Sequence, residues 1–385
     1  MIRLGRLRAG ALIVGALAVV QMGTSAASAD VQGTPPVCAK PDGHVDASAI
    51  SAGVLYIGGS FSHVTDLSGR SQPRAGLAAI NMGSCDLLPW RADANKQVYA
   101  LAVHGSTVYA GGAFTAVSAT SRYGVAALDA SSGKVLPFAP HVSGTVRALT
   151  TSGTSVYAGG TFTKVNGSPR SHLAAVDVNT GALSGSWKPS ASGTVRALAP
   201  SANGSRIYVG GSFSALDGRS GSGYLGAVDP TTGALDAGFS PNLSFPVLSL
   251  DADSNGVYAG GGGSGGHLAI WNADGSLQQP VYQTDGDVQA IAVDGGTVYG
   301  GGHFGNYCVD NTGGGAPYMC DKPLRRHKLF AVSLSTGAVT SWAPMLNSNL
   351  GVFTEAVDGA SGDLWVGGDF TTVNGVSRPH VAVFR

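Results

Sequence analysis

The chain has 385 residues, enough for one large domain or two ordinary ones. Only 12% of its residues are charged and its formal net charge is zero, so it carries no electrostatic footprint for nucleic acid and no polybasic patch for an anionic membrane. Glycine is abundant, at 59 residues, but it has no three-residue period, which excludes a collagen and indicates a turn-rich all-β protein.

The N-terminus is typical of a secretory signal peptide. Arg3, Arg6 and Arg8 form a basic region, and the apolar segment 11–20 is too short for a membrane-spanning helix. The small-residue cleavage motif Ala-Ser-Ala ends at residue 29. We therefore expect a signal peptide over 1–29, one mature domain over 30–385, and an extracellular, secreted protein with no later membrane span.

A repeated unit is marked by two glycines that follow an aromatic residue, as in "VYAGGTF" from Val156. The first glycines of these pairs are Gly58, Gly111, Gly159, Gly210, Gly260, Gly301 and Gly367. The units are about fifty residues apart, with a short fifth unit and a long sixth. A period of this size is typical of a β-propeller or a solenoid.

Each unit contains the pattern of four short strands. In the third unit these are "VRAL" from Val146, the double-glycine strand, "LAAVD" from Leu173, and a fourth segment that ends at Trp187. Alternating apolar residues with glycine-containing turns between them predict antiparallel hairpins, and four such strands make a propeller blade. Glycine inside a strand is tolerated where a neighbouring unit approaches closely.

The two ends of the chain predict how the ring of blades closes. The seventh unit ends within its third strand, and the mature N-terminus aligns with a fourth strand, with Val45 over Val195 and Val37 over Trp187. We therefore expect the segment 34–40 to pair with the third strand of the seventh unit and to remove two sheet edges. The predicted fold is an all-β, seven-bladed β-propeller of four-stranded antiparallel blades, closed by an N-terminal strand that completes the last blade.

The unit "VRAL…GGTFTKVNGSPRSHLAAVD" resembles the delta-60 repeat of bacterial β-propellers and, more distantly, is similar to the kelch blade. The resemblance covers nearly all of the mature chain and is weakest in unit five, which lacks the "FTxVNGxxR" loop. Unit six differs through an inserted loop that contains cysteines. The resemblance implies a secreted or surface propeller and implies no particular reaction.

An arginine recurs three residues before the third strand of most units. These residues are Arg74, Arg122, Arg170, Arg326 and Arg378, with Arg219 somewhat earlier in unit four. They predict a structural role, in which each guanidinium donates to loop carbonyls or to an acid such as Asp177, because a residue common to all repeats serves what the repeats share. The alternative is an arginine ring that binds a polyanion.

The segment "DADSNG" of unit five matches the first half of a calcium-binding loop. Its candidate ligands are Asp251, Asp253 and Asn255, and calcium is the one candidate cofactor. The twelfth position is Gly262 instead of a bidentate acid, so a tight hairpin turn is the favoured alternative.

The insertion in unit six is a candidate binding site at one end of the ring. His303 replaces the small residue that follows the double glycine in other units, with Tyr307 beside it and Arg326 after the insertion. Loops at one end of a scaffold often bind ligands. The alternative is a surface excursion held by a disulfide.

Four cysteines follow the predicted cleavage site, and an even count in an exported protein predicts two disulfides. Cys308 and Cys320 flank the unit-six insertion and are natural partners. Cys38 and Cys85 remain by elimination. Geometry argues against this second pair. Cys85 takes the place of a turn glycine at one end of a blade, and Cys38 is expected at the opposite end. The length of a strand then separates the two sulfur atoms, which is too far for a disulfide.

No catalytic motif accompanies the repeat: we find no sialidase box and no G-x-S-x-G elbow, and "AVDVNTGALSGSW" departs from the quinoprotein pattern by two residues. The sequence therefore predicts a monomeric secreted binding or scaffold module that recognises an extracellular protein or glycan through loops at one end. The alternative is an extracellular hydrolase, lyase or quinoprotein with its site at the channel mouth. Clustered carboxylates or histidines at the mouth would favour the enzyme, and a neutral surface would favour the binding module.

Overall fold

The computed structural model describes residues 35–241, 243–278, 281–308 and 323–385. These ranges consist of strands and loops, and within them no helix is long and apolar enough to cross a membrane. The predicted signal peptide, residues 1–29, lies outside the described residues, as does Cys320.

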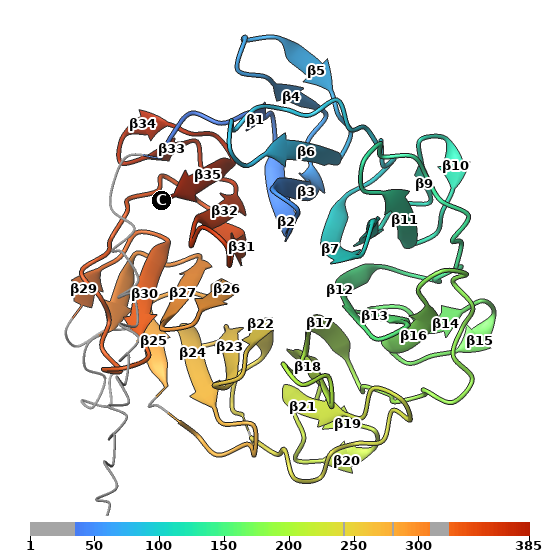
Figure 1. The fold of residues 1–385 in the computed structure, drawn as a ribbon. Coiled ribbons are helices and arrows are strands. Elements are labelled where there is room, and N and C mark those ends of the chain that lie inside the picture. Colours follow the sequence, from blue (N-terminus) through green and yellow to red (C-terminus); the bar gives the residue numbers. More distant parts are fainter. Residues whose placement is uncertain (1–34, 242, 279–280, 309–322) are drawn as a thin grey trace, which may run out of the picture.

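Sheets arranged around a central opening dominate the described part of the chain (Figure 1). Seven of them share one antiparallel order, in which the first strand lies nearest the opening and the second lies between the first and the third. The first strands are β2 (His44–Ser51), β7 (Val98–His104), β12 (Val146–Ser152), β17 (Thr194–Pro200), β22 (Val247–Ala252), β26 (Val288–Asp294) and β31 (Val352–Val357).

The second strands carry the double glycines, and the third strands carry the "LAAVD" pattern. The second strands are β3 (Val54–Ser60), β8 (Thr107–Gly112), β13 (Ser155–Gly160), β18 (Ile207–Ser212), β23 (Val257–Gly261), β27 (Thr297–Gly302) and β32 (Leu364–Gly368). The third strands are β6 (Leu77–Asn81), β11 (Val125–Asp129), β16 (Leu173–Asp177), β21 (Leu225–Val228), β24 (Gly266–Trp271), β30 (Leu329–Ser333) and β35 (Val381–Phe384).

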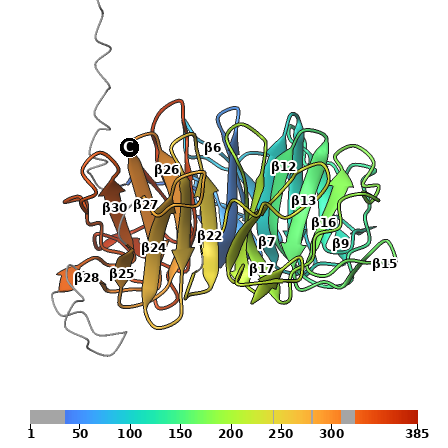
Figure 2. The same ribbon diagram turned by 90° about the horizontal axis from the view of Figure 1, so that it is seen from below.

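Short two-stranded hairpins between the second and third strands form the periphery. They are β4 (His63–Thr65) with β5 (Ser71–Pro73), β9 (Ala116–Val117) with β10 (Thr120–Ser121), β14 (Lys164–Val165) with β15 (Ser168–Pro169), β19 (Ala215–Leu216) with β20 (Arg219–Ser220), β28 (Asn306–Cys308) with β29 (Pro323–Arg325), and β33 (Thr372–Val373) with β34 (Val376–Ser377). Seen from the side, the strands stand next to one another along the axis of the ring, and β28 lies at the outer edge beside β25 (Tyr282–Thr284) (Figure 2).

Each sheet packs on the next through the first glycine of its pair. A Cβ atom placed on Gly159 would meet the side chain of Val195, which opens the next inner strand. The same contact joins Gly58 to Val98, Gly111 to Val146, Gly210 to Val247, Gly260 to Val288, Gly301 to Val352 and Gly367 to Val45. The predicted close approach of a neighbouring unit is therefore confirmed, and the contact from Gly367 to Val45 joins the last sheet to the first.

The apolar core lies between neighbouring sheets, where an aromatic pair from one sheet bonds to the next. In the third sheet, Tyr157 and Trp187 stand edge to face at 5.2 Å between ring centroids. The Tyr157 hydroxyl donates to Pro230 O at 2.7 Å and Trp187 Nε1 donates to Asp229 O at 3.0 Å, both in the fourth unit. These bonds satisfy the polar ends of two buried aromatic side chains and fix the angle between sheets.

The fourth strand predicted for each unit is wrong in most of the described sheets. The segment after the third strand makes one isolated bridge, as between Val176 and Leu183, and then leaves the sheet. The exception is the fifth sheet, where β25 pairs with β24 and continues into β28 and β29 of the sixth unit. In the third unit, Trp187 lies in the core four positions after the bridge residue Leu183, so the segment leaves the sheet before a ladder forms.

The N-terminal segment lies against the seventh sheet without forming the predicted ladder with residues 380–384. Arg378 Nε donates to Pro35 O at 2.7 Å, at the place where Leu136 O accepts from Arg122 in the second unit. In that unit the amide of Leu136 also donates a hydrogen bond to Ala127 O on the third strand. Pro35 has no N–H, so it cannot donate the corresponding bond to the third strand of the seventh sheet. Val37 is 48% exposed, so it does not replace the buried aromatic residue.

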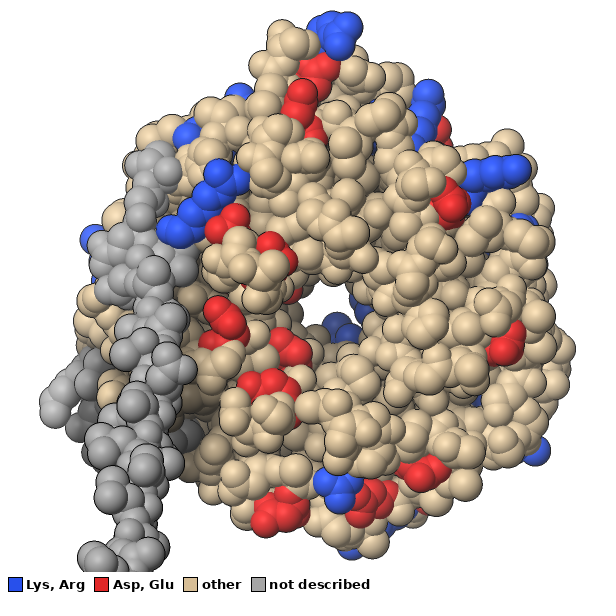
Figure 3. All heavy atoms as spheres, in the orientation of Figure 1, with Lys and Arg blue, Asp and Glu red and all other residues tan. Residues whose placement is uncertain are grey.

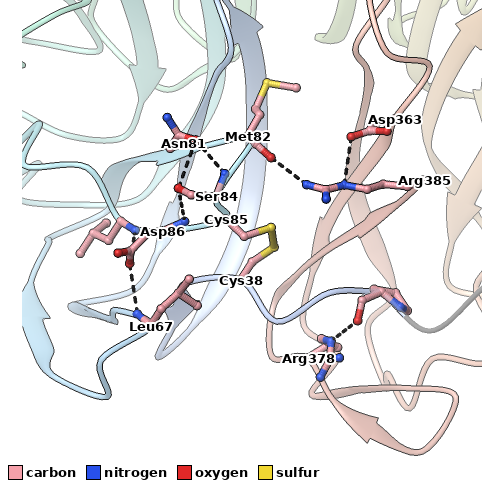
Figure 4. Close-up of a disulfide and its surroundings, with 12 residues drawn as sticks. Cys38, Leu67, Asn81, Met82, Ser84, Cys85, Asp86, Asp363, Arg378 and Arg385 are labelled. Atoms are coloured by element: carbon pink, nitrogen blue, oxygen red, sulfur yellow. Dashed lines mark hydrogen bonds and ion pairs between the residues drawn. A yellow bond between two sulfur atoms is a disulfide. The ribbon is translucent and has the colours of Figure 1, made fainter.

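The same segment nevertheless reproduces the contacts between neighbouring units. β1 (Lys40–Pro41) pairs with β4, and its register of Pro41 with Val64 matches the bridge between Val142 and Val165 in later units. The hydroxyls of Ser48 on β2 and Thr354 on β31 lie 2.7 Å apart. Arg385 forms an ion pair with Asp363 at 3.3 Å and donates a hydrogen bond to Met82 O (Figure 4). In other units the equivalent carbonyl, such as Pro230 O, accepts a hydrogen bond from a tyrosine hydroxyl of the preceding unit.

The Cys38–Cys85 disulfide is present, with the Cα atoms 4.4 Å apart (Figure 4). The geometric objection to this pair was wrong because it considered the distance within one sheet. A turn glycine lies against the preceding unit, since a Cβ on Gly181 would meet Ala139 and Pro140. Cys85, with φ of 62°, occupies the turn-glycine position of unit one, and Cys38 occupies the facing position. The other predicted disulfide, Cys308–Cys320, involves a residue outside the described ranges.

Candidate functional site in the central channel

A cavity of about 500 Å³ lies on the axis of the ring and is lined by residues of all seven inner strands. Its size is in the range of small-molecule binding sites. The opening seen in Figure 3 leads to this cavity. Basic side chains are visible inside the opening, and acidic side chains gather beside it, over β22, β26 and β31.

One position in each repeat contributes a residue of varying chemistry to the lining of this cavity. Every inner strand has a β-bulge after its first valine, as between Val146 and Ala148. A bulge redirects a side chain and is frequent beside functional sites. The bulged residues all line the cavity, and we call them the channel ring: Asp46, Tyr99, Arg147, Arg196, Leu248, Gln289 and Phe353.

Sequence reasoning missed the channel ring, although a signal for it existed. The motif "VRAL" was used only to define a strand. The first residue of this motif is valine in every unit, and it packs on the glycine of the neighbouring sheet. The second residue of the motif differs between units. The next residue is the one that the β-bulge leaves unpaired and redirects toward the channel.

Two arginines form the basic wall of the channel. The Arg147 guanidinium lies over the ring of Tyr99, 4.8 Å from its centroid, a cation–π contact. Arg196 Nε donates to Ser212 Oγ at 3.2 Å. Among the described residues neither arginine forms an ion pair. Burial and repulsion from Arg147 lower the pKa of Arg196, and Asp287 opposes this effect.

Acidic and amide groups occupy other parts of the wall. Asp46 accepts a hydrogen bond from Gln97 Nε2 at 2.9 Å, and the Tyr99 hydroxyl donates to Gln97 Oε1 at 2.9 Å. Burial raises the pKa of Asp46, and the bond from Gln97 works against that rise. Asp287 precedes β26 and lines the same cavity.

Glu355 is a buried carboxyl on β31 that lines the cavity. Neither of its carboxyl oxygens has a hydrogen-bond partner, and burial raises its pKa well above the usual value. Four other units have leucine at its position: Leu101, Leu149, Leu198 and Leu250. Ser249 Oγ and Gln289 Oε1, on the two preceding inner strands, also lack partners and line the cavity. The unpartnered oxygens of Glu355 and Ser249 lie against the strand glycines Gly301 and Gly260, so they are enclosed by the packing and do not face the channel.

Two smaller hollows lie beside unit five, which has no outer hairpin within the described residues. One of about 350 Å³ is lined by Asp287, His303 and Lys328, and it shares Asp287 with the channel. The other, of about 300 Å³, includes His267, whose ring stacks on Phe245 at 4.3 Å between centroids.

The three residues predicted as a binding site do not line one common hollow. His303 is exposed and lines the hollow next to the channel. Tyr307 on β28 packs on Phe330 at 5.9 Å between ring centroids, and burial raises its pKa to about 12. Arg326 donates to Arg325 O at 2.8 Å and to Thr340 O at 2.7 Å. A ligand-binding role for these residues stays a prediction.

The recurring arginines donate to backbone carbonyls, as their structural interpretation predicted. Arg170 Nη1 donates to Pro169 O at 2.8 Å and Nη2 donates to Ser184 O at 2.7 Å. The corresponding bonds are made by Arg74, Arg122 and Arg326, and Arg378 bonds to Ser377 O and Pro35 O. Each guanidinium ties the outer hairpin to the fourth segment, and Asp177 instead accepts from its own turn.

The candidate calcium ligands form a hairpin turn in which the carboxylates accept backbone hydrogen bonds. Asp253 Oδ1 accepts from the amides of Asn255 and Gly256 and from the Tyr258 hydroxyl. Asp251 accepts from Ala252 and, across to the sixth sheet, from Val293 at 3.0 Å. Over the described ranges, no group of three or more His, Cys, Asp or Glu side chains is arranged to hold a metal ion.

The sequence matches no known protein family and no curated protein. Solved structures share its fold. The computationally designed Ika8 protein is 15% identical over 91% of this chain and 99% of its own, with a TM-score of 0.53. The WD40 β-propeller domain of Doa1 is 12% identical over 92% of this chain and 97% of its own, with a TM-score of 0.57. The chain is therefore an all-β protein with a propeller-like fold, and the disulfide is compatible with an extracellular location.

Proposed function

We propose that this chain is a secreted, closed seven-bladed β-propeller of the delta-60 repeat kind, and that it is an extracellular binding module whose ligand enters the central channel. Closure is supported by the contacts between the last and first units: Val45 on Gly367, the pairing of β1 with β4, and the Cys38–Cys85 disulfide. Each repeats a contact between consecutive units elsewhere in the chain.

The observation that carries the proposed function is the channel ring. Residues shared by every unit, such as the recurring arginines, are used in packing and backbone bonding. The channel-ring position instead differs in every unit except two, and it supplies charged, amide and aromatic groups to a cavity of about 500 Å³. Variation at a position that a repeated scaffold does not need for packing is expected where a ligand is recognised.

A binding screen with a channel-narrowing variant tests this function. Mature protein, residues 30–385, is screened by thermal shift and calorimetry against glycans and small metabolites. Leu248→Trp should reduce binding of the probes found, because tryptophan at this position projects into the channel, where Tyr99 and Phe353 show that aromatic residues are accepted. Val376→Trp is the control, on the outer hairpin at 40% exposure. Binding unaffected by Leu248→Trp, or a screen without any binding, would contradict the proposal.

One observation favours the enzyme alternative: two carboxyls with raised pKa values, Asp46 and Glu355, line the cavity. Perturbed carboxyls in a cleft are candidates for acid–base catalysis. Mass spectrometry of each bound probe after incubation distinguishes the two functions. Product formation that is lost in Glu355→Gln would establish the enzyme, and recovery of the unchanged probe supports the binding module.

A further inference from the structure

We propose that the seam, the contact between the seventh and first units, is an acid-sensitive switch that opens when two adjacent histidines both become protonated. The inference rests on the ring closure proposed above and adds a conformational change to it. The two residues are His44, at the start of β2, and His380, directly before β35. Their ring centroids lie 6.2 Å apart, and the His44 ring also lies 5.9 Å from that of Phe353 on β31.

The fold does not require histidine at position 380, because it uses only the backbone there. The amide of His380 donates to Phe370 O at 2.8 Å, and its carbonyl accepts from Gly368 N at 3.1 Å. Its φ of 65° is left-handed, as are the φ values of His172 and Tyr224 at the same position in units three and four. Glycine occupies this position in units one and two. Packing therefore does not explain why two histidines meet at the seam.

The join between units five and six carries the opposite charge arrangement. His267 occupies the same position in unit five, and Asp287 directly precedes the inner strand of unit six. Burial lowers the pKa of His267, and the Asp287 carboxylate opposes this effect. At the seam, burial lowers the pKa of His380, its hydrogen bond to Gly368 O opposes this effect, and His44 adds to it. A carboxylate thus favours protonation at one join, and a second imidazole opposes it at the other.

Two carboxylates also act on the His380 ring, and both are engaged with other donors. Asp369 accepts hydrogen bonds from two amides of the linker before β31, both at 3.0 Å. Asp42 accepts from the amide of His63 at 3.0 Å and lies 3.4 Å from the ring Nδ1 of the same residue. Both raise the pKa of His380, which still remains below its usual value of 6.5. The folded protein therefore binds this proton less tightly than the unfolded chain does, and it loses stability as pH falls below 6.5.

The seam joins units that are distant in sequence, and it contains a natural reporter of its own opening. The described N-terminal segment makes no ladder with β35, so noncovalent contacts such as that of Val45 with Gly367 hold the seam. The Cys38–Cys85 disulfide is buried in one apolar cluster with Trp365 of unit seven. A reductant reaches a buried disulfide when the surrounding structure opens locally. The rate of reduction of this disulfide therefore measures how often the seam opens.

Reduction of the folded mature protein by tricarboxyethylphosphine, followed by alkylation and peptide mass spectrometry, tests the inference. His380→Tyr is compared with wild type between about pH 7.5 and 5, since Tyr224 shows that tyrosine is accepted at this position. Comparison at each pH removes the pH dependence of the reagent. Acid should speed reduction of Cys38–Cys85 in wild type at least about threefold relative to the variant, from two unit charges 6.2 Å apart in a medium close to water. His172→Tyr is the matched control and should behave as wild type.

Two results would overturn the inference while the closed ring stands. One is an acid effect as large in His380→Tyr as in wild type, and the other is the same loss of the effect in His172→Tyr. Rapid reduction of wild type at every pH would reject the ring closure itself. His44→Gln repeats the test from the other side of the seam, because unit two has Gln97 at the equivalent position. It replaces His380→Tyr if thermal unfolding at neutral pH shows that the tyrosine variant does not fold.

Discussion

Replacing Glu355 by leucine should make the protein more stable. The carboxyl is buried and neither oxygen has a partner, and leaving a buried polar group unpaired costs about 1–3 kcal/mol. Leucine fits the site, since Leu149 and Leu250 lie against the corresponding glycines of other sheets. We expect Glu355→Leu to raise the free energy of unfolding by about 2 kcal/mol, or roughly 3 °C in Tm for a domain of this size.

The gain should depend on pH with a defined sign. The folded protein raises the pKa of Glu355 above 4.5, so it binds the proton more tightly than the unfolded chain does. Wild-type stability is therefore lost as pH rises from about 4.5 through the folded pKa, and the leucine variant does not lose it. Urea unfolding of both proteins between pH 4 and 8 measures this difference. Glu355→Gln, which keeps an unpaired polar group, is the control and should gain less.

Two results would refute this reasoning. A leucine variant that is no more stable than wild type would mean that the carboxyl has partners in solution. A stability gain that is constant from pH 4 to 8 would mean that folding does not raise the pKa of this carboxyl. A gain in stability together with lost ligand binding would support a functional reason for Glu355, because a stability cost at a site is often retained for function.

Three further changes should affect stability in predictable ways. Gly159→Ala should lower the free energy of unfolding by about 1–3 kcal/mol in thermal unfolding, because the new Cβ atom would meet the valine of the next sheet. Gly185→Ala is the control, because the space around Gly185 is open. Equal effects of the two substitutions would be inconsistent with this packing. Replacing Cys38 and Cys85 by serine should cost about 4 kcal/mol, because the disulfide closes a loop of 47 residues in the unfolded chain. Unchanged urea unfolding would mean that this disulfide does not stabilise the protein. Burial raises the pKa of Asp251 to about 6, so its contribution to stability should fall by about 3 kcal/mol as pH rises from 3.8 through 6. Asp251→Asn should flatten this part of the plot of unfolding free energy against pH. An unchanged slope in the variant would mean that other groups cause the pH dependence.

The repeat was predictable because packing between units imposes the same residues on every unit. The glycine of each pair and the valine that packs on it recur for this reason, as do the arginines that donate to backbone carbonyls. The join between Val45 and Gly367 could be predicted by aligning the N-terminus with Val195. These parts of the fold follow from contacts that every unit must make.

The remaining features depend on contacts that the repeat pattern does not contain. The Cys38–Cys85 disulfide crosses between units, and distances within a single sheet gave the wrong answer. The missing ladder at Pro35 reflects an absent amide hydrogen, which alignment of apolar positions does not consider. The channel ring was missed because its residues differ between units, and ligand recognition needs such differences whereas packing does not.

A crystal structure of the mature protein grown with the tightest-binding probe of the glycan and metabolite screen tests the central claim most directly. We expect the probe inside the channel, in contact with residues of the channel ring such as Arg147 and Tyr99. A probe bound only at the outer loops, for example beside His303, with the channel free of it, would contradict binding in the channel.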